Sequence, residues 1–289
     1  VTSSAQDTLI AGQTATITFT LSEASSDFTQ DDVVVDGGAL SNFAVVSGTV
    51  YTATFTPTAN STTAANISVS SSKFSDAAGN TNADGGDANN SLSLTVDTVL
   101  PTLTVTSSAQ DTLIAGQTAT ITFTLSEASS NFTRDDVVVD GGSLSDLTGS
   151  GTVYTATFTP DTNSSTPATI RVTNASFTDA AGNNAVVVAG DTLTIPVDTQ
   201  APQVTADQIS VSGDTGENGF YIQNDTLMVT WNNGALGDNN SDIASVTVNL
   251  LAIGGSEAQT MTWDASTGLW SATHTITDAS TNGNNLDVS

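Results

Sequence analysis

The chain of 289 residues contains no cysteine and almost no positive charge. Without cysteine it can form neither disulfide bonds nor thiolate metal sites. Lys73, Arg134 and Arg171 are its only lysine and arginine residues, against 30 acidic residues, and the formal net charge is -27. A surface this negative repels nucleic acids and anionic lipids, so we expect neither as a partner.

Side chains suited to catalysis are equally scarce. His274 is the only histidine, and no serine–histidine–aspartate or cysteine–histidine set accompanies it, so we expect a packed strand residue. Paired carboxylates could serve a glycosidase, but residues 1–199 carry no tryptophan for a sugar platform. The sequence therefore predicts a protein that is not an enzyme.

Long apolar runs are also missing, and no segment approaches the roughly 20 residues of a membrane span. Membrane insertion is therefore not expected. Hydrophobic residues still make up 37% of the chain, and charged residues only 11%. That is enough apolar material to build cores, which separates this chain from disordered acidic tails.

An internal repeat sets the domain organisation. Residues 1–26 recur without change at 105–130, and later motifs follow in the same order. A period near 100 residues is too long for a solenoid unit and fits a small β-domain that folds by itself. We expect repeat 1 at residues 1–98, a near-identical repeat 2 at 99–199, and a different module 3 at 200–289. Module 3 ends where another strand should start, so we expect it to be truncated at its C-terminus.

The strand pattern indicates the fold class. Ala15, Ile17, Phe19 and Leu21 alternate with threonines, which is the period of a strand with one buried face. Turn residues recur every 8–12 positions, and no stretch has helical periodicity. About seven short strands in about 100 residues predict a Greek-key sandwich. We therefore expect an all-β chain of tandem immunoglobulin-like Greek-key β-sandwiches arranged end to end.

Four motifs, in order, carry a family resemblance. They are TFTLSE followed by FT-x-DDVVV-x-GG, then GTVYTATFTP, then F-x-DAAGN, and finally VDT-x-x-P. In this order they resemble the bacterial immunoglobulin-like repeats of giant adhesins, which are secreted by type I systems (the RTX type) or displayed on bacterial surfaces. The resemblance implies an extracellular stalk that calcium stiffens and that holds a binding domain away from the cell.

The acidic residues gather at one end of each predicted sandwich. The loops after the second and sixth strands lie at the pole where the chain enters the module. Carboxylates converging there repel one another unless a cation binds, and calcium takes six to eight oxygen ligands without histidine or cysteine. For repeat 2 and its linker the candidate ligands are Asp97, Glu127, Asp135, Asp136, Asp179 and Asn183. An ion shared by linker and module would fix the angle between the domains.

The other two modules carry related sets. Acidic loops are often only solvated turns, and this reading stays open for every candidate. The candidate ligands in repeat 1 are Glu23, Asp31, Asp32, Asp76 and Asn80, and those for module 3 are Asp198, Asp238, Asn240 and Asp242.

The leading hypothesis is a calcium-stiffened spacer of an adhesin, a monomer whose partners are calcium ions and neighbouring repeats. A first alternative is a carbohydrate- or protein-binding module, which two exposed tryptophans side by side would favour. A second alternative is an accessory array of a secreted polysaccharide-degrading enzyme. The tryptophans in question, all in module 3, are Trp231, Trp263 and Trp270.

Overall fold

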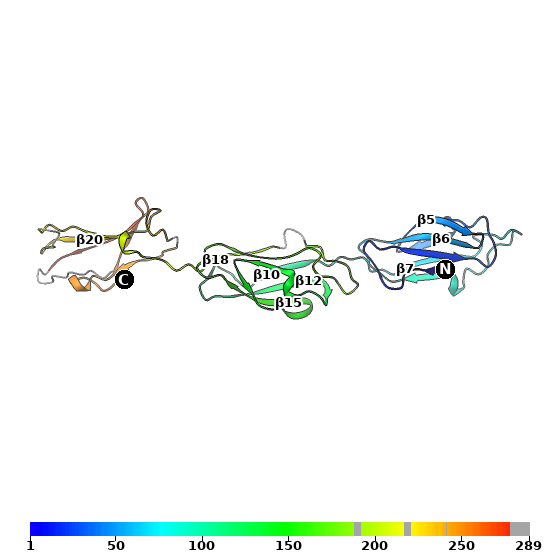
Figure 1. The fold of residues 1–289 in the computed structure, drawn as a ribbon, viewed down its shortest axis with the longest axis horizontal. Helices are drawn as coiled ribbons and strands as arrows, with labels where there is room; N and C mark the ends of the chain where they lie inside the picture. The colour runs from blue at the N-terminus through cyan, green and yellow to red at the C-terminus, as the bar shows by residue number, and fades with distance from the viewer. Residues whose placement is uncertain (188–191, 217–220, 241, 278–289) are drawn as a thin grey trace. The chain divides into compact units, whose positions relative to one another are not determined.

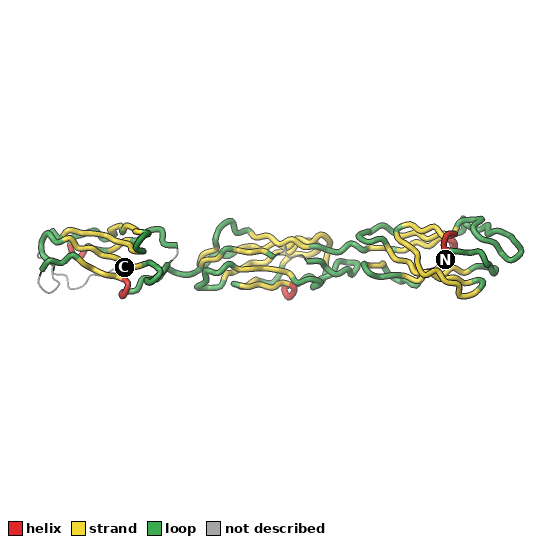
Figure 2. The backbone as a smooth tube through the Cα atoms, turned by 90° about the horizontal axis from the view of Figure 1, so that it is seen from above, coloured by secondary structure: helices red, strands yellow, loops and turns green. Residues whose placement is uncertain are grey.

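The computed structural model describes all residues except 188–191, 217–220, 241 and 278–289 (Figure 1). Strands and turns make up nearly all of it, with short 3-10 helices, and the described residues include no α-helix (Figure 2). Two compact units are present, Val1–Gln200 and Ala201–Ser289. The first holds repeats 1 and 2, and the second holds module 3. No helix in the described part of the chain has the length and hydropathy to cross a membrane.

Repeat 1 is a sandwich of two sheets with the strand order of an immunoglobulin-like module. One sheet has the order β1-β3-β6-β5 and the other β4-β7-β8, which correspond to the ABED and CFG sheets of that fold. The chain changes sheet between β3 and β4, as a Greek key requires. The strands are Thr2–Ser3 (β1), Leu9–Ile10 (β2), Ala15–Thr20 (β3), Val33–Asp36 (β4), Gly38–Ser47 (β5), Val50–Pro57 (β6), Ala65–Val69 (β7), Ser91–Leu94 (β8) and Val96–Asp97 (β9).

Repeat 2 has the same topology, with sheets β10-β12-β15-β14 and β13-β16-β17. Its β15 is longer than β6 of repeat 1, and its β14 is shorter than β5, because the sequences of the two repeats diverge in this hairpin. The strands are Leu103–Ser107 (β10), Leu113–Ile114 (β11), Ala119–Ser129 (β12), Val137–Asp140 (β13), Gly142–Leu144 (β14), Thr148–Pro160 (β15), Ala168–Val172 (β16), Leu193–Ile195 (β17) and Val197–Asp198 (β18).

A short parallel pair closes each repeat. In repeat 1, β2 runs beside β9, with Leu9 opposite Val96 and Ile10 opposite Asp97. The first and last of the seven predicted strands are therefore each split in two. This pairing places the turn after β2 next to the end of β9, so the linker acid Asp97 lies beside the turn that contains Ala11.

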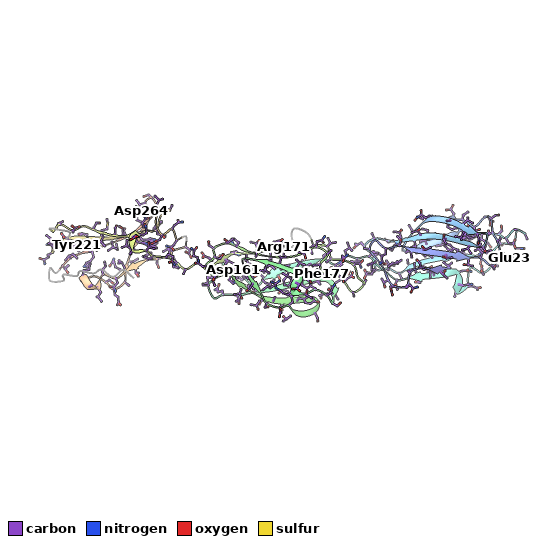
Figure 3. The ribbon with its side chains drawn as sticks, viewed as in Figure 1. Glu23, Asp161, Arg171, Phe177, Tyr221 and Asp264 are labelled. Atoms are coloured by element: carbon purple, nitrogen blue, oxygen red, sulfur yellow. The ribbon has the colours of Figure 1, made fainter. Side chains whose placement is uncertain are left out.

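The cores follow from the alternation seen in the sequence. Ala15, Ile17 and Phe19 are almost completely buried, while the threonines between them face outward. In repeat 2, Phe132 packs edge-on against Tyr154 and Phe177, with ring centroids 5.2 and 5.1 Å apart. Phe177 lies inside the sandwich (Figure 3). Burial of these apolar faces is the main stabilising term of each module.

Module 3 is a separate β-fold with a four-stranded sheet in the order β19-β20-β24-β23 and a smaller pair, β21-β22. Its last hairpin turns through Asp264, and Asp264 Oδ1 accepts the Ser266 N–H at 2.9 Å. The expected truncation of the final strand falls on residues 278–289, which lie outside the described residues. The strands are Ile209–Ser212 (β19), Thr226–Asn232 (β20), Thr247–Val248 (β21), Gln259–Thr260 (β22), Thr262–Asp264 (β23) and Leu269–Thr275 (β24).

Candidate metal centre

The loop at residues 179–183 in repeat 2, with the sequence DAAGN, is closed by its own first residue. Asp179 Oδ1 accepts the backbone N–H groups of Gly182 at 2.7 Å and Asn183 at 2.9 Å, and Oδ2 accepts the Asn183 side-chain amide at 2.8 Å. Gly182 adopts φ +106°, a conformation that residues with a Cβ rarely adopt. The Asp179 carboxylate, only 5% exposed, is therefore held in one orientation.

Three carboxylates meet at this loop. Asp97 comes from the end of β9 in repeat 1, Glu127 from the end of β12, and Asp179 from the 179–183 loop. One oxygen of each can be chosen so that all three lie within 4.8 Å of one another. Asp97 and Glu127 are half-buried and Asp179 is buried. The sequence-based expectation that a linker acid meets two acids of the following repeat describes this arrangement.

Two of the three groups titrate abnormally, in opposite directions. Burial raises the pKa of Glu127, and contact with Asp179 and the charges of Asp97 and Asp179 raise it further. Burial alone would also raise the pKa of Asp179, but the hydrogen bonds from Asn183 and Gly182 outweigh it, and its pKa is lowered. The cluster therefore holds negative charges close together, and their repulsion contributes to the raised pKa of Glu127.

The donor set suits calcium. Two oxygens on one calcium ion cannot lie farther apart than about 5 Å, because each sits about 2.3–2.6 Å from the metal. The three carboxylate oxygens meet that limit. Magnesium demands a near-ideal octahedron, and zinc prefers nitrogen or sulfur ligands, so a hard, geometrically tolerant cation fits these residues best.

Comparison with protein families assigns both repeats. The model of a bacterial Ig-like domain matches residues 1–96 and again residues 97–197. The chain belongs to this family. No curated protein matches it.

Solved structures with detectable similarity include two bacterial proteins. A crystal structure of invasin, described as a bacterial integrin-binding protein, is 16% identical with a TM-score of 0.33 over 93% of this chain. The chain spans about half of that protein, 52% of its length. InvD of Yersinia pseudotuberculosis is 19% identical with a TM-score of 0.29, covering 78% of this chain and 68% of that one.

The first bacterial Ig-like domain repeats the loop but not the three-carboxylate cluster. Asp76 Oδ1 accepts the N–H groups of Ala78 at 2.9 Å and Asn80 at 2.8 Å, and Oδ2 accepts the Asn80 side-chain amide at 2.8 Å. These bonds, led by those from Asn80, lower the pKa of Asp76. Glu23, Asp76 and Asn80 line a cavity of about 900 Å³ at the N-terminal end of this domain, where Glu23 is labelled in Figure 3.

The paired aspartates before β4 and β13 lie outside the cluster. Asp32 Oδ2 accepts the Thr29 N–H at 2.8 Å, and Asp136 Oδ2 accepts the Thr133 N–H at 2.7 Å. Each carboxylate thus caps a 3-10 turn, Gln30–Asp32 or Arg134–Asp136, through a capping box. A threonine three residues before the second aspartate was the sequence signal for this role. Asp31 and Asp135, the first aspartate of each pair, are exposed.

Asp198 stands where Asp97 stands in the preceding domain. Its Oδ1 accepts the Gln200 N–H at 3.2 Å, just as Asp97 Oδ1 accepts the Val99 N–H at 3.2 Å. Within the residues that the structure describes, only Asp97, Glu127 and Asp179 form a group of three potential acidic ligands.

The module 3 candidates are engaged in hydrogen bonds. Asp238 Oδ2 accepts the Trp231 indole N–H at 2.6 Å and the Thr205 N–H at 2.9 Å. Asn240 accepts the Gln203 N–H at 2.7 Å and donates to the Gln203 carbonyl at 2.7 Å. The two side chains fasten the segment containing Gln203 and Thr205 to the sheet. Asp242 is exposed.

The tryptophans of module 3 belong mainly to its core. Trp231 is 3% exposed and Trp270 is 8% exposed, whereas Trp263, on edge strand β23, is 40% exposed. Trp263 packs against Trp270 with ring centroids 5.5 Å apart. With one exposed ring instead of two, the platform that would favour a carbohydrate-binding module is not formed. His274 Nε2 lies 3.2 Å from the Ile253 carbonyl oxygen, as a packed strand residue would.

Sequence reasoning missed the residues that join the two repeats beside the cluster. The Ala11 N–H donates to Asn183 Oδ1 at 2.8 Å, and the Val186 N–H donates to the Pro101 carbonyl at 2.9 Å. Thr98, only 5% exposed, donates from its hydroxyl to the Thr58 carbonyl at 2.8 Å and so anchors the linker to repeat 1. Most of these are backbone groups, and the sequence carries no signal for them.

Proposed function

We propose that this chain is a stretch of non-catalytic spacer modules from the stalk of a giant bacterial surface adhesin of the type I-secreted kind. Calcium bound by Asp97, Glu127 and Asp179 stiffens the connection between repeats 1 and 2. The observation that carries the proposal is the meeting of a linker acid with two acids of the next module. The chain acts outside the cell as a monomer, and its partners are calcium ions and neighbouring repeats.

The mechanism depends on where each acid is fixed. Asp179 is held by its loop, Glu127 lies near the end of β12, and Asp97 is placed by the pairing of β9 with β2. When bound, calcium would supply the positive charge that turns the repulsion among these carboxylates into attraction. Because the acids come from both sides of the linker, satisfying one ion holds repeat 2 in a single orientation to repeat 1.

The near-identity of the repeats supports a spacer. Copying a module extends reach without the need for a new binding surface, and residues 1–26 and 105–130 are the same. The sequence also offers few side chains for catalysis, with one histidine and no cysteine. The function therefore resides in the geometry of the junctions.

Calorimetric titration of the whole chain with calcium, after chelation, tests the proposal. We expect heat of binding in the wild type and at least about tenfold weaker binding at this site in Asp97→Asn, because affinity follows the number of charged ligands. Asp146→Asn is the matched control, since it removes an exposed acid of repeat 2 that is remote in sequence from all three ligands. Equal binding by all three proteins, or none by the wild type, would overturn the proposal.

Small-angle scattering supplies the second readout. In calcium the wild type should give the scattering of a stiff particle, and chelation should loosen the junction only in part, because the hydrogen bonds between the repeats remain. Asp97→Asn should scatter as the chelated wild type does in either condition. A wild-type profile that is indifferent to calcium would show that the ion does not stiffen the junction.

A further inference from the structure

We infer that the 179–183 loop of repeat 2 is a docking element for the C-terminal end of a repeat of the same type, and that Asn183 closes this contact by hydrogen bonds alone. The inference rests on the proposed spacer function and deepens it, because it assigns a device that orients the junction before any ion binds. The sequence-based reading had placed Asn183 among the metal ligands.

Asn183 is one of the most deeply buried polar side chains in the described chain, at 2% exposure. Its Oδ1 accepts the Ala11 N–H of repeat 1 at 2.8 Å. Its Nδ2 donates to the Asp97 carbonyl oxygen at 3.0 Å and to Asp179 Oδ2 at 2.8 Å. Both amide hydrogens and the amide oxygen are used, and two of the three bonds reach across to repeat 1 and its linker.

The groups that Asn183 meets on repeat 1 are positioned by backbone pairing. Ile10 lies opposite Asp97 in the parallel pair of β2 and β9. The Ala11 N–H and the Asp97 carbonyl therefore lie side by side, one a donor and the other an acceptor. A primary amide carries a donor and an acceptor on separate atoms and so can satisfy both at once.

Close packing surrounds these hydrogen bonds. A Cβ at Gly182 would lie 3.9 Å from Ile10 Cδ1, so the loop glycine lies against a side chain of repeat 1. On the linker, Pro101 is buried and its carbonyl accepts the Val186 N–H at 2.9 Å. Shielding from water strengthens the Asn183 bonds and makes an unpaired donor or acceptor costly there.

The loop is preorganised for this contact. In repeat 1, Asp76 and Asn80 make the corresponding internal bonds, with the Asn80 amide 2.8 Å from Asp76 Oδ2, although Asn80 is exposed and Asp76 is only partly buried. The loop thus takes its shape without a neighbour, and docking needs little further ordering. Recognition requires only the paired turn and strand end of another repeat, which makes the contact specific for repeats of this type.

Distance measurements between spin labels test the inference in the full chain. The protein has no cysteine, so labels attach only at introduced sites. Thr56→Cys in repeat 1 and Thr157→Cys in repeat 2 place them at exposed strand positions. All measurements are made in chelator, so that no ion contributes to the orientation of the repeats.

We expect a narrow distance distribution for the labelled parent and a broad one for Asn183→Ala. Loss of two hydrogen bonds should lower the ratio of docked to undocked junctions about 30-fold. Asn183→Asp keeps the acceptor for Ala11 but loses both donors and adds charge beside Asp97, so it should broaden the distribution further. Asn80→Ala removes the same loop bond in repeat 1 and should leave the distribution narrow, which separates docking from loop damage.

A distribution that stays narrow in both Asn183 variants, or that broadens equally in Asn80→Ala, would overturn the inference. The outcome is distinguishable from failure of the calcium proposal. If calcium does not bind, the parent distribution is the same with and without the ion, yet Asn183→Ala still broadens it. If the docking contact fails, calcium still binds the three carboxylates and narrows a distribution that is broad in chelator.

Discussion

Glu127 and Asp179 bring carboxylate oxygens within 4.8 Å of each other, yet their pKa values move in opposite directions. Hydrogen bonds from Asn183 and Gly182 stabilise the charge on Asp179, while Glu127 has burial and two negative neighbours. The loop thus favours the charged form of Asp179, whereas the surroundings of Glu127 disfavour its charged form. The same kind of substitution should therefore act differently at the two positions.

Replacing Glu127 with glutamine should stabilise repeat 2 in chelator and destabilise it in calcium. In chelator, Glu127→Gln should raise the free energy of unfolding of repeat 2 slightly, by no more than about 1 kcal/mol, because a partly exposed repulsion is relieved. In calcium, the variant should bind the ion about tenfold more weakly than the wild type does, and its melting temperature should be lower. Scanning calorimetry with and without the ion measures both. A fall in stability in chelator would show that Glu127 has a favourable partner there.

The pH dependence of the chelated protein follows from the same pair. The raised pKa of Glu127 means that the folded state holds its proton more tightly, so repeat 2 should gain stability as pH falls through that pKa towards 4.5. The lowered pKa of Asp179 contributes stability above its ordinary value of 3.8, which is lost as pH falls further. The melting temperature of chelated repeat 2 should therefore pass through a maximum at mildly acidic pH. Glu127→Gln should abolish the gain in stability on mild acidification and keep the loss of stability at lower pH.

The strand pattern and the position of the cluster could be predicted because they depend on local rules. Alternation in residues 15–21 fixes which face is buried, and the Ig-like order of strands brings the loops containing Glu127 and Asp179 to one end. Asp97 joins them because it ends β9, the last strand of repeat 1. Sequence distance is large here, but topology makes these residues neighbours.

The remaining candidates show where such reasoning stops. Asp136 and Asp238 are also acids outside the strands, and they accept hydrogen bonds from Thr133 in one case and from Thr205 and Trp231 in the other. What sets them apart from Asp179 is position, because neither lies in the group of three carboxylates found among the described residues. The contact of Asn183 with Ala11 depends on how two domains meet, and one partner is a backbone amide. The capping role of Asp136 does have a sequence signal, the threonine three residues before it, but the contact of Asn183 with Ala11 has none in residue type or spacing.

Asp27 offers a pH test in repeat 1. Bonds from Ser75 and Ser25 hold its pKa at about 2, well below 3.8. It therefore contributes stability above pH 3.8 that is lost as pH falls towards 2. Asp27→Asn should make the stability of repeat 1 depend less on pH between pH 3.8 and about 2. The fold tolerates the amide, because Asn131 occupies this position in repeat 2 and accepts the Thr178 N–H at 3.0 Å.

The reverse exchange is the control for that experiment. Asn131→Asp should give repeat 2 an acid-labile contribution that the wild-type repeat lacks, since Ser129 and Thr178 surround the position as Ser25 and Ser75 surround Asp27. Acid denaturation followed by circular dichroism reports both variants. Unchanged acid limbs in the two proteins would contradict the assignment.

Tyr154 connects the core of repeat 2 to the end of β12 that carries Glu127. Its buried hydroxyl donates to the Ser129 carbonyl at 2.7 Å, two residues after Glu127. Tyr154→Phe leaves that carbonyl without this donor and should destabilise repeat 2 by about 1–2 kcal/mol. Because the tether also positions the loop of Glu127, calcium binding at the junction should weaken. Thermal melting and calorimetric titration measure the two effects.

Tyr51 is the matched residue in repeat 1, where its hydroxyl donates to the Ser25 carbonyl at 2.6 Å. Tyr51→Phe should lower the stability of repeat 1 by a similar amount, because the buried hydrogen bond is the same. It should leave calcium binding at the junction unchanged, since Glu127 and Asp179 belong to repeat 2. Equal losses of calcium affinity in the two variants would show that the tether acts through general destabilisation instead of through the position of Glu127.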